Sequence, residues 1–222
     1  MKLKKAFLYI LMLLPLAVTV VSLFFLPEQI PAHYNISGEV DRWGSKFETL
    51  VFPAFCIILG LIMLFMARYY EKRGEAGAGN ANACVITGIA CLVLFNAMTV
   101  YYLYADFKSV EQLDAMPIDI GRLVFGILGV VMIIIGGLMP EIKMNSLMGL
   151  RTPWSRKNET VWRKSQKFGG LSFIAGGILI IVLCVPLKGA PLMLSGLSIL
   201  LVLLAVDVYY TYRVAQKYPD NN

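Results

Sequence analysis

The sequence predicts an all-α, polytopic membrane protein with six transmembrane helices, and three observations support this fold class. First, 58% of the 222 residues are hydrophobic and 15% are charged, and the mean hydropathy is +0.70. Such a chain has too little polar surface to coat a soluble globule. Second, six apolar runs reach or nearly reach the roughly 20 residues that span a bilayer. Third, Lys and Arg gather in alternate connections between these runs.

The six runs cover 6–26, 50–67, 84–104, 123–139, 171–187 and 192–212. Because the backbone in lipid must satisfy its own hydrogen bonds, each run is expected to be a helix. None of the runs alternates polar and apolar residues with a period of two, as the strands of a transmembrane barrel would. A signal peptide is the alternative for the first run, but its apolar core is longer than the usual length of about 7–15 residues. We therefore expect an uncleaved first helix.

The basic residues set the expected orientation, because cytoplasmic connections of membrane proteins are enriched in Lys and Arg. Fifteen of the 20 basic residues precede the first run, follow the sixth, or lie in the second and fourth connections. The opposite side carries five bases and eight acids. Both termini are therefore predicted to be cytoplasmic. The net charge of +6 reflects this basic inner face, which suits anionic lipid head groups and gives no reason to expect direct nucleic-acid binding.

Four units are expected along the chain. Residues 1–70 form an N-terminal two-helix unit with an extracellular loop at 27–49, and 71–122 hold the third helix and an acidic outer loop. Residues 123–187 form a unit with a cytoplasmic loop at 140–170, and 188–222 form the C-terminal helix and tail. Glycine is dense in the fourth and fifth runs, which favours close helix packing in lipid. The connection after the fifth run is so short that the last two helices must form an antiparallel hairpin.

The first outer loop is rich in proline, aromatic, charged and turn residues, as a binding loop would be. Asn35 and Gly38 are expected to form a turn. Asp41 is expected to form a surface ion pair with Arg42 or Lys46. The residues predicted to bind a ligand at the outer face are Pro31, His33, Asn35, Gly38, Asp41, Trp43 and Lys46.

A metal site is the alternative for part of this loop. His33, Glu39 and Asp41 are the only close group of residues of the types that bind metals, but their spacing matches no standard site. His33 is more simply a hydrogen-bonded loop residue. We therefore predict no metal and no other cofactor.

Two polar residues lie deep within the runs. Asn96 is expected to form a hydrogen bond between helices. Asp207 is the only charged residue inside any run, and such a charge is costly unless it faces other helices and has a partner. We expect it to pair with a base such as Arg151 or Arg68, while a coupling or proton site is the alternative.

The fourth connection is the longest on the inner side, and it is not composed like a linker. Asn158 is expected to cap a helix, with Glu159 where a negative charge suits the helix dipole. The residues that follow predict a short amphipathic helix in the head-group layer before the fifth span. One interpretation is a membrane-surface anchor, and the other is a docking surface for a cytoplasmic partner. The residues assigned to docking are Asn145, Gly149, Arg151, Thr152, Pro153, Trp154, Asn158, Trp162 and Arg163.

Part of this connection resembles the signature of the SdpI family, although Met144 stands where the family pattern has proline. The residues that carry the resemblance are Asn145, Gly149, Arg151, Thr152, Pro153, Trp154, Asn158, Glu159, Trp162, Gly169 and Gly170. The outer loop resembles an uncharacterised domain that often precedes that signature. The resemblance implies a membrane immunity protein of the bacterial plasma membrane that protects against a secreted toxic peptide met at the outer face. It also implies signalling, in which the protein holds a small cytoplasmic winged-helix repressor at the membrane.

Other functions are less well supported by the sequence. It contains no His-Glu-x-x-His, Gly-x-Ser-x-Gly or Walker A sequence, and its only histidine is on the outer side, so we predict that the protein is not an enzyme. A secondary transporter or exporter of a small amphipathic substrate is the alternative, because glycine-rich helices and Asp207 could line a pathway. The six runs show no clear inverted repeat, which speaks against this alternative.

Overall fold

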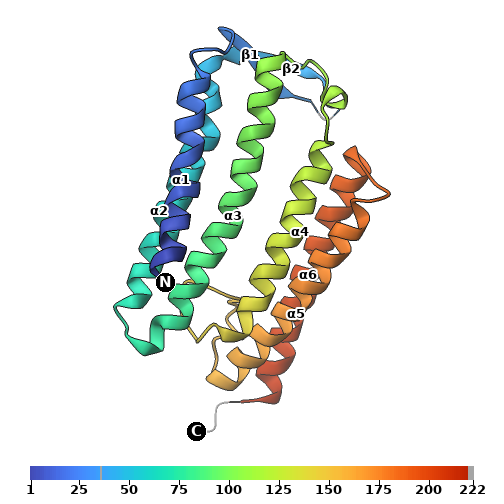
Figure 1. The fold of residues 1–222 in the computed structure, drawn as a ribbon. Coiled ribbons are helices and arrows are strands. Elements are labelled where there is room, and N and C mark those ends of the chain that lie inside the picture. Colours follow the sequence, from blue (N-terminus) through green and yellow to red (C-terminus); the bar gives the residue numbers. More distant parts are fainter. Residues whose placement is uncertain (36, 220–222) are drawn as a thin grey trace.

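The structure, a computed structural model, describes residues 1–35 and 37–219 and contains six long helices (Figure 1). Their bounds are Lys2–Ser22 (α1), Val51–Glu71 (α2), Glu75–Lys108 (α3), Ile120–Leu138 (α4), Glu159–Leu183 (α5) and Gly189–Lys217 (α6). Each lies in a helical segment long and apolar enough to cross a membrane. The prediction of a helical, multi-pass membrane protein with six spans is therefore confirmed.

The connections hold smaller elements that the sequence did not predict. Two strands, Gln29–Tyr34 (β1) and Val40–Ser45 (β2), pair antiparallel in the first outer loop. Three 3-10 helices are Lys46–Leu50 (η1), Leu113–Ala115 (η2) and Met139–Glu141 (η3). The outer loop is thus an ordered hairpin, whereas only a turn was expected.

The helices form two groups of three (Figure 1). Helices α1, α2 and α3 pack against one another, α4, α5 and α6 do the same, and α3 contacts α4 between the groups. Each group has its own apolar core. Buried residues of the first core include Leu8, Met12, Cys56, Leu64 and Leu92, and those of the second are Phe125, Met132, Ile180 and Leu192.

Glycines let α4 and α5 approach closely, as the sequence predicted. A Cβ atom on Gly136 would lie 2.5 Å from the carbonyl oxygen of Gly170. One on Gly129 would lie 2.7 Å from the carbonyl oxygen of Gly177. Backbone therefore packs directly on backbone at two levels of this helix pair. Helices α5 and α6 form the expected antiparallel hairpin (Figure 1).

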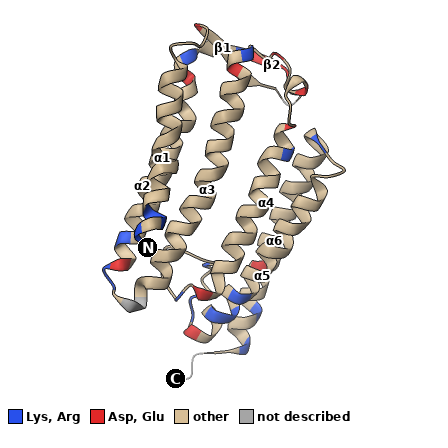
Figure 2. Cartoon of the chain, viewed as in Figure 1, with Lys and Arg blue, Asp and Glu red and all other residues tan. Residues whose placement is uncertain are grey.

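Charge is distributed unevenly between the two ends of the molecule. Both termini lie at one end of the helices, and the β1–β2 hairpin lies at the other (Figure 1). Figure 2 shows that most Lys and Arg gather toward the end with the termini, while acids are frequent around the hairpin. We call these the basic end and the hairpin end. The arrangement agrees with the positive-inside rule, and the cytoplasmic location of the basic end stays a prediction.

Helix α5 corrects one prediction about the fourth connection. A separate amphipathic helix in the head-group layer was expected, but α5 is one helix from Glu159 to Leu183. Asn158 caps it as predicted, because its Oδ1 accepts a hydrogen bond of 2.9 Å from the backbone of Val161. The pair Gly169 and Gly170 does not break the helix. Both glycines are buried, where they allow close packing against η3, so tertiary contacts hold them in helical conformation.

Candidate functional site

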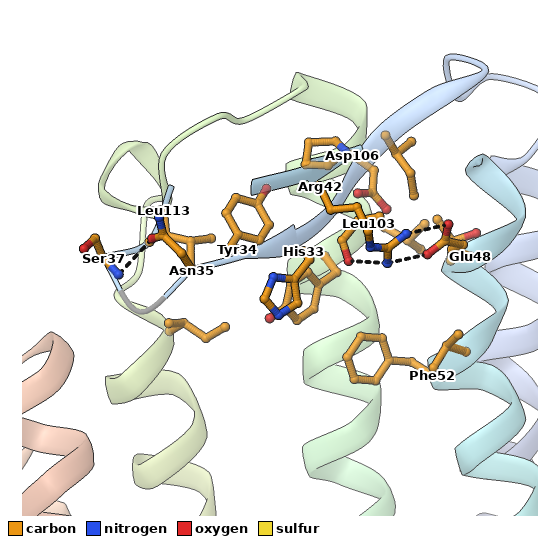
Figure 3. A pocket seen from close by; sticks show the side chains of 18 of the residues that line it. His33, Tyr34, Asn35, Ser37, Arg42, Glu48, Phe52, Leu103, Asp106 and Leu113 are labelled. Atoms are coloured by element: carbon orange, nitrogen blue, oxygen red, sulfur yellow. Dashed lines mark hydrogen bonds and ion pairs between the residues drawn. The ribbon is translucent and has the colours of Figure 1, made fainter. Parts of the chain in front are cut away.

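A cavity of about 600 Å³ lies at the hairpin end, beneath β1 and between the ends of α2, α3, α4 and α6 (Figure 3). Its apolar lining includes Ile30, Pro31, Phe52, Leu103, Leu113 and Met193. Its charged or titratable lining consists of His33, Arg42, Glu48, Asp106, Asp114 and Asp119, with the phenols of Tyr34 and Tyr102. The cavity therefore combines an apolar interior with more acidic than basic groups.

The roof of the cavity is a hairpin whose turn is built by one asparagine. The side-chain oxygen of Asn35 accepts hydrogen bonds from the backbone of Ser37 at 2.9 Å and Glu39 at 3.0 Å. The backbone of Gly38 donates to the carbonyl of Asn35 at 2.9 Å, and Gly38 has a φ of +82° that favours glycine. The predicted turn at Asn35 and Gly38 is confirmed.

The hairpin is fastened to the connection between α3 and α4. The backbone of Leu113 donates to the carbonyl of Gly38 at 2.8 Å, and that of Val40 donates to Glu111 at 2.9 Å. The hydroxyl of Tyr34 donates to the carbonyl of Val110 at 2.8 Å. Because these bonds join segments more than 70 residues apart, the roof is held over the cavity by tertiary contacts and not by the turn alone.

Ion pairs on the hairpin differ from the expected ones. Asp41 lies 2.5 Å from His33 Nδ1, and it is therefore not paired with Arg42 or Lys46 as predicted. Arg42 instead pairs with Glu48 at 2.8 Å, and Lys46 pairs with Glu28 at 2.9 Å. The strand pairing explains the change. Register shifts on both sides of His33 place it opposite Arg42 of β2, next to Asp41 in the chain.

Asp106 and Tyr34 are titratable groups of the cavity wall, and the carboxyl group of Asp106 contributes to the pKa of the Tyr34 phenol. Asp106, near the hairpin end of α3, is 3% exposed. Burial, with the neighbouring charge of Asp106, raises the pKa of the Tyr34 phenol well above its usual value. Tyr34 is therefore a neutral hydrogen-bond donor in the roof at any physiological pH. Within residues 1–35 and 37–219 no group of three His, Cys, Asp or Glu side chains could hold a metal ion.

A second ordered region lies at the basic end, in the connection between η3 and α5. We call residues 142–157 the inner loop. The loop folds around Gln166 of α5, whose side chain is fully buried. The amide oxygen of Gln166 accepts a hydrogen bond of 2.9 Å from the backbone N–H of Leu150, and its amide nitrogen donates one of 2.9 Å to the Leu150 carbonyl. Gly149 has a φ of +89°, and a Cβ there would lie 2.4 Å from Gln166 Oε1. The loop is thus wrapped closely around one amide.

The inner loop also joins the two helix groups. Asn145 accepts a hydrogen bond of 2.7 Å from Tyr70 of α2, and the backbone of Lys143 donates to Asn80 of α3 at 3.0 Å. On the other side, the hydroxyl of Thr152 donates to Thr211 of α6 at 2.8 Å. The indole of Trp162 donates to the carbonyl of Ile142 at 2.7 Å. These contacts make the loop a connector between α2, α3, α5 and α6.

The residues predicted to dock a partner therefore fall into two sets. The buried or half-buried set, whose side chains form contacts within the protein, consists of Asn145, Thr152, Asn158 and Trp162. The exposed set, whose side chains reach the surface of the basic end, consists of Arg151, Pro153, Trp154 and Arg163. Gly149 belongs to neither set, because its positive φ lets the loop turn. Docking itself stays a prediction, and only the exposed set is available for it without opening the loop.

Of the two predictions about polar residues within the spans, one is confirmed and the other is wrong. Asn96 donates to the carbonyl of Leu11 in α1 at 2.9 Å, so the predicted bond between helices is confirmed. Asp207 is 2% exposed and has no ion pair in the part of the chain that the structure describes. Its expected pairing with Arg151 or Arg68 is wrong. Arg151 donates to the carbonyl of Ser146, and Arg68 donates to the hydroxyl of Tyr9.

In comparisons with known proteins, each of the two ordered regions lies in a segment that matches a family model. Residues 141–211, which contain the inner loop, match the SdpI/YfhL protein family. The resemblance to the SdpI family is confirmed. Residues 10–57, which contain the hairpin, match a domain of unknown function, DUF1648.

Two relatives also match the chain, the first of them over most of its length. The chain is 26% identical over 195 residues to Immunity protein SdpI of Bacillus subtilis strain 168, a match that covers 87% of this chain and 86% of that protein. It is also 42% identical over 43 residues to an uncharacterised protein of Archaeoglobus fulgidus, covering 19% of this chain and 24% of the relative. No solved structure matches the chain significantly.

The sequence reasoning missed several residues that organise the inner loop and the cavity at the hairpin end (the outer cavity). Gln166 and Thr211 hold the inner loop, yet each looks like an ordinary polar residue of a helix. Asp106 was expected in the acidic outer loop after the third run, but it lies buried in the cavity wall. The periodicity of α3 did offer one signal, because Asp106 is one helical turn from Tyr102, which lines the same cavity.

The residues predicted to bind a ligand at the outer face fall into three groups. Pro31, His33, Asn35 and Gly38 line the cavity. Trp43 is 44% exposed and lines a separate depression with Glu39 and Gln112. Asp41 and Lys46 form ion pairs on the hairpin instead.

Proposed function

We propose that this chain is a non-enzymatic membrane immunity protein of a bacterial plasma membrane that binds a toxic peptide in its outer cavity. The observation that carries the proposal is the cavity at the hairpin end, about 600 Å³ in volume and roofed by an ordered hairpin. Its size is within the usual range for binding sites, about 300–1,000 Å³. The relative named Immunity protein SdpI supplies the biological role.

The chemistry of the cavity suits a cationic, amphipathic peptide. Its acids outnumber its bases, and Arg42 is already paired with Glu48. Acidic groups at a membrane surface raise the local concentration of a cationic ligand. The aromatic and aliphatic lining would then accept apolar side chains of the peptide. Protection would follow because bound peptide is withheld from the bilayer.

The test is a killing assay in a sensitive bacterium that expresses the chain, against a panel of membrane-active peptides. Ala190→Trp places a large side chain at an exposed position of the cavity lining. Leu194→Trp is the matched control, because Leu194 is 67% exposed and does not line the cavity. We expect Ala190→Trp to lower the tolerated peptide concentration about tenfold, equivalent to about 1.4 kcal/mol of binding. Leu194→Trp should protect like the unchanged chain.

Two results would contradict the proposal. Equal protection by both tryptophan variants, at equal membrane abundance, would show that the outer cavity is not the peptide site. Failure of the unchanged chain to protect against any peptide in the panel would contradict the immunity role itself.

We further propose that the exposed set of the inner loop docks a small cytoplasmic winged-helix repressor. Pro153 and Arg156 line a shallow depression of about 520 Å³ at the basic end, and Trp154 lies beside it in the chain with 39% of its surface exposed. Exposed aromatic and arginine side chains are common anchors of protein interfaces. A reporter for the repressed operon, read separately from survival, checks this role. Trp154→Ala should abolish induction and leave protection intact, and unchanged induction would remove the docking role.

A further inference from the structure

A second cavity, of about 390 Å³, lies between the two helix groups toward the basic end. Helices α2, α3, α4, α5 and α6 all contribute to it, and Leu147–Leu150 of the inner loop closes one side. Its lining is almost entirely apolar. Five of the lining residues are methionines: Met63, Met66, Met132, Met139 and Met148. Methionine side chains are flexible and polarisable, so they adapt to ligands of irregular shape.

One carboxyl group interrupts this apolar surface. Asp207 of α6 lines the cavity, is 2% exposed, and has no hydrogen-bond partner at Oδ1. The hydroxyl of Ser172 on α5 lies close enough to act on the Asp207 carboxyl, but the two groups do not meet with hydrogen-bond geometry, and the hydroxyl has no other partner. A buried polar atom without a partner costs roughly 1–3 kcal/mol. The structure thus leaves an acceptor unsatisfied at the wall of a preformed cavity.

Two bases of the inner loop make other contacts. Arg151 donates to the carbonyl of Ser146, and Lys157 lies 3.5 Å from the carbonyl of Ala215. The four salt bridges in the described part of the chain do not involve Asp207. The described part of the chain thus supplies no cationic partner for the carboxyl group, and a cationic ligand would supply one.

We propose that this cavity binds a hydrophobic amine, with its protonated nitrogen donating a hydrogen bond to Asp207 and its apolar body packed among the methionines. The charge of the ammonium group complements the carboxylate, and its N–H satisfies Oδ1. A lipid acyl chain would fill the space without either interaction, and an anionic ligand would be repelled. The cavity volume lies at the lower end of the range for small-molecule sites, which suits a compact ligand.

This site is distinct from the outer cavity. No residue lines both, and the proposal does not depend on peptide immunity. An amine bound here would contact both helix groups and the inner loop together. Binding would consequently favour the arrangement in which the groups are closed around the cavity.

The methionines provide a direct test in the full chain. Methyl-labelled protein in lipid nanodiscs is titrated with adamantan-1-amine and with dodecylamine, and each methyl resonance is followed by NMR. Resonances are assigned by single Met→Leu substitutions. We expect saturable shifts at the five cavity methionines. Met12 and Met116, which lie outside the cavity, should not shift and also report on the fold.

Matched ligands and variants isolate the amine contact. Adamantan-1-ol and dodecan-1-ol have the same apolar bodies without the positive charge, and they should bind at least about tenfold more weakly. Asp207→Asn should weaken amine binding by a similar factor and leave alcohol binding unchanged. Thr87→Met fills the cavity from α3 and keeps Asp207, so it should abolish the shifts even if the Asp207 variant fails to fold.

Several outcomes would overturn the proposal. Equal binding of amines and alcohols would show a generic apolar crevice of the kind that a lipid chain fills. Unchanged amine binding in Asp207→Asn would remove the carboxyl from the site. Absence of saturable shifts with both amines would show that the cavity does not bind this class of compound.

Discussion

At the scale of single residues, Gly149 shows how tightly the inner loop is specified. Its φ of +89° is unfavourable for other residues, and a Cβ would lie 2.4 Å from the amide oxygen of Gln166. Displacing that amide would leave the backbone N–H of Leu150 without its partner. We therefore expect Gly149→Ala to cost about 1–3 kcal/mol.

Thermal unfolding in detergent and tryptic cleavage at the exposed Arg151 and Arg156 measure this effect. Gly149→Ala should unfold at lower temperature and be cut faster in the loop. Gly137→Ala is the matched control, because nothing lies within 4 Å of the position a Cβ would take there. If the two variants behave alike, the wrapping of the loop around Gln166 does not stabilise the protein.

Local sequence rules succeeded for residues whose partners are close in the chain. Asn158 was expected to cap a helix and does, and Asn35 was expected to begin a turn and does. They failed where partners are distant. The partner of Gln166 is 16 residues away, and that of Asp41 is set by a bulged strand pair. Nothing within a few residues of either side chain indicates these contacts.

At the scale of elements, the α4–α5 pair depends on which glycines face the interface. Gly129 and Gly177, together with Gly136 and Gly170, bring backbone against backbone, whereas nothing lies within 4 Å of the position that a Cβ on Gly126 would take. We expect Gly177→Leu to force the helices apart and to cost about 1–3 kcal/mol through overpacking. Gly126→Leu should be nearly neutral.

Paired cysteines on α4 and α5, cross-linked in native membranes, measure the separation of the two helices. Cross-linking should fall in Gly177→Leu and stay unchanged in Gly126→Leu. Equal cross-linking in both variants would contradict the glycine interface.

The six spans followed from composition because the bilayer requires about 20 apolar residues in a helix. The hairpin did not follow from any such rule. Strands β1 and β2 are six residues each, and Pro31 lies inside the first. An isolated two-stranded hairpin is marginally stable. It is ordered here because Leu113 and Glu111 form backbone hydrogen bonds with it. Both residues lie in the connection between α3 and α4, more than 70 residues further along the chain.

At the scale of the whole molecule, hydropathy indicated the number of helices but not their grouping. The two groups of three meet mainly where α3 contacts α4 and where the inner loop bonds to Tyr70 and Asn80. Apolar helix faces do not choose partners in lipid by hydrophobicity, since the lipid is equally apolar. The choice depends on shape and on a few hydrogen bonds, which the sequence does not reveal.

Sidedness is the whole-molecule property on which both functional proposals depend. The hairpin end must face outward for its cavity to meet a secreted peptide, and the basic end must face the cytoplasm for a repressor to reach the inner loop. The concentration of Lys and Arg at the basic end predicts this orientation (Figure 2). A cysteine-free chain, with alanine at Cys56, Cys84, Cys91 and Cys184, allows a direct measurement.

Single cysteines are then introduced at two exposed positions, Arg156 in the inner loop and Glu111 in the connection beside the hairpin. With a membrane-impermeant maleimide added to intact cells, we expect Glu111→Cys to be labelled at once. Arg156→Cys should be labelled only after the membrane is made permeable, because the predicted orientation places its thiol in the cytosol. Labelling of Arg156→Cys in intact cells would reverse the orientation, and it would remove the structural basis for peptide binding at the outer cavity and for repressor docking at the inner loop.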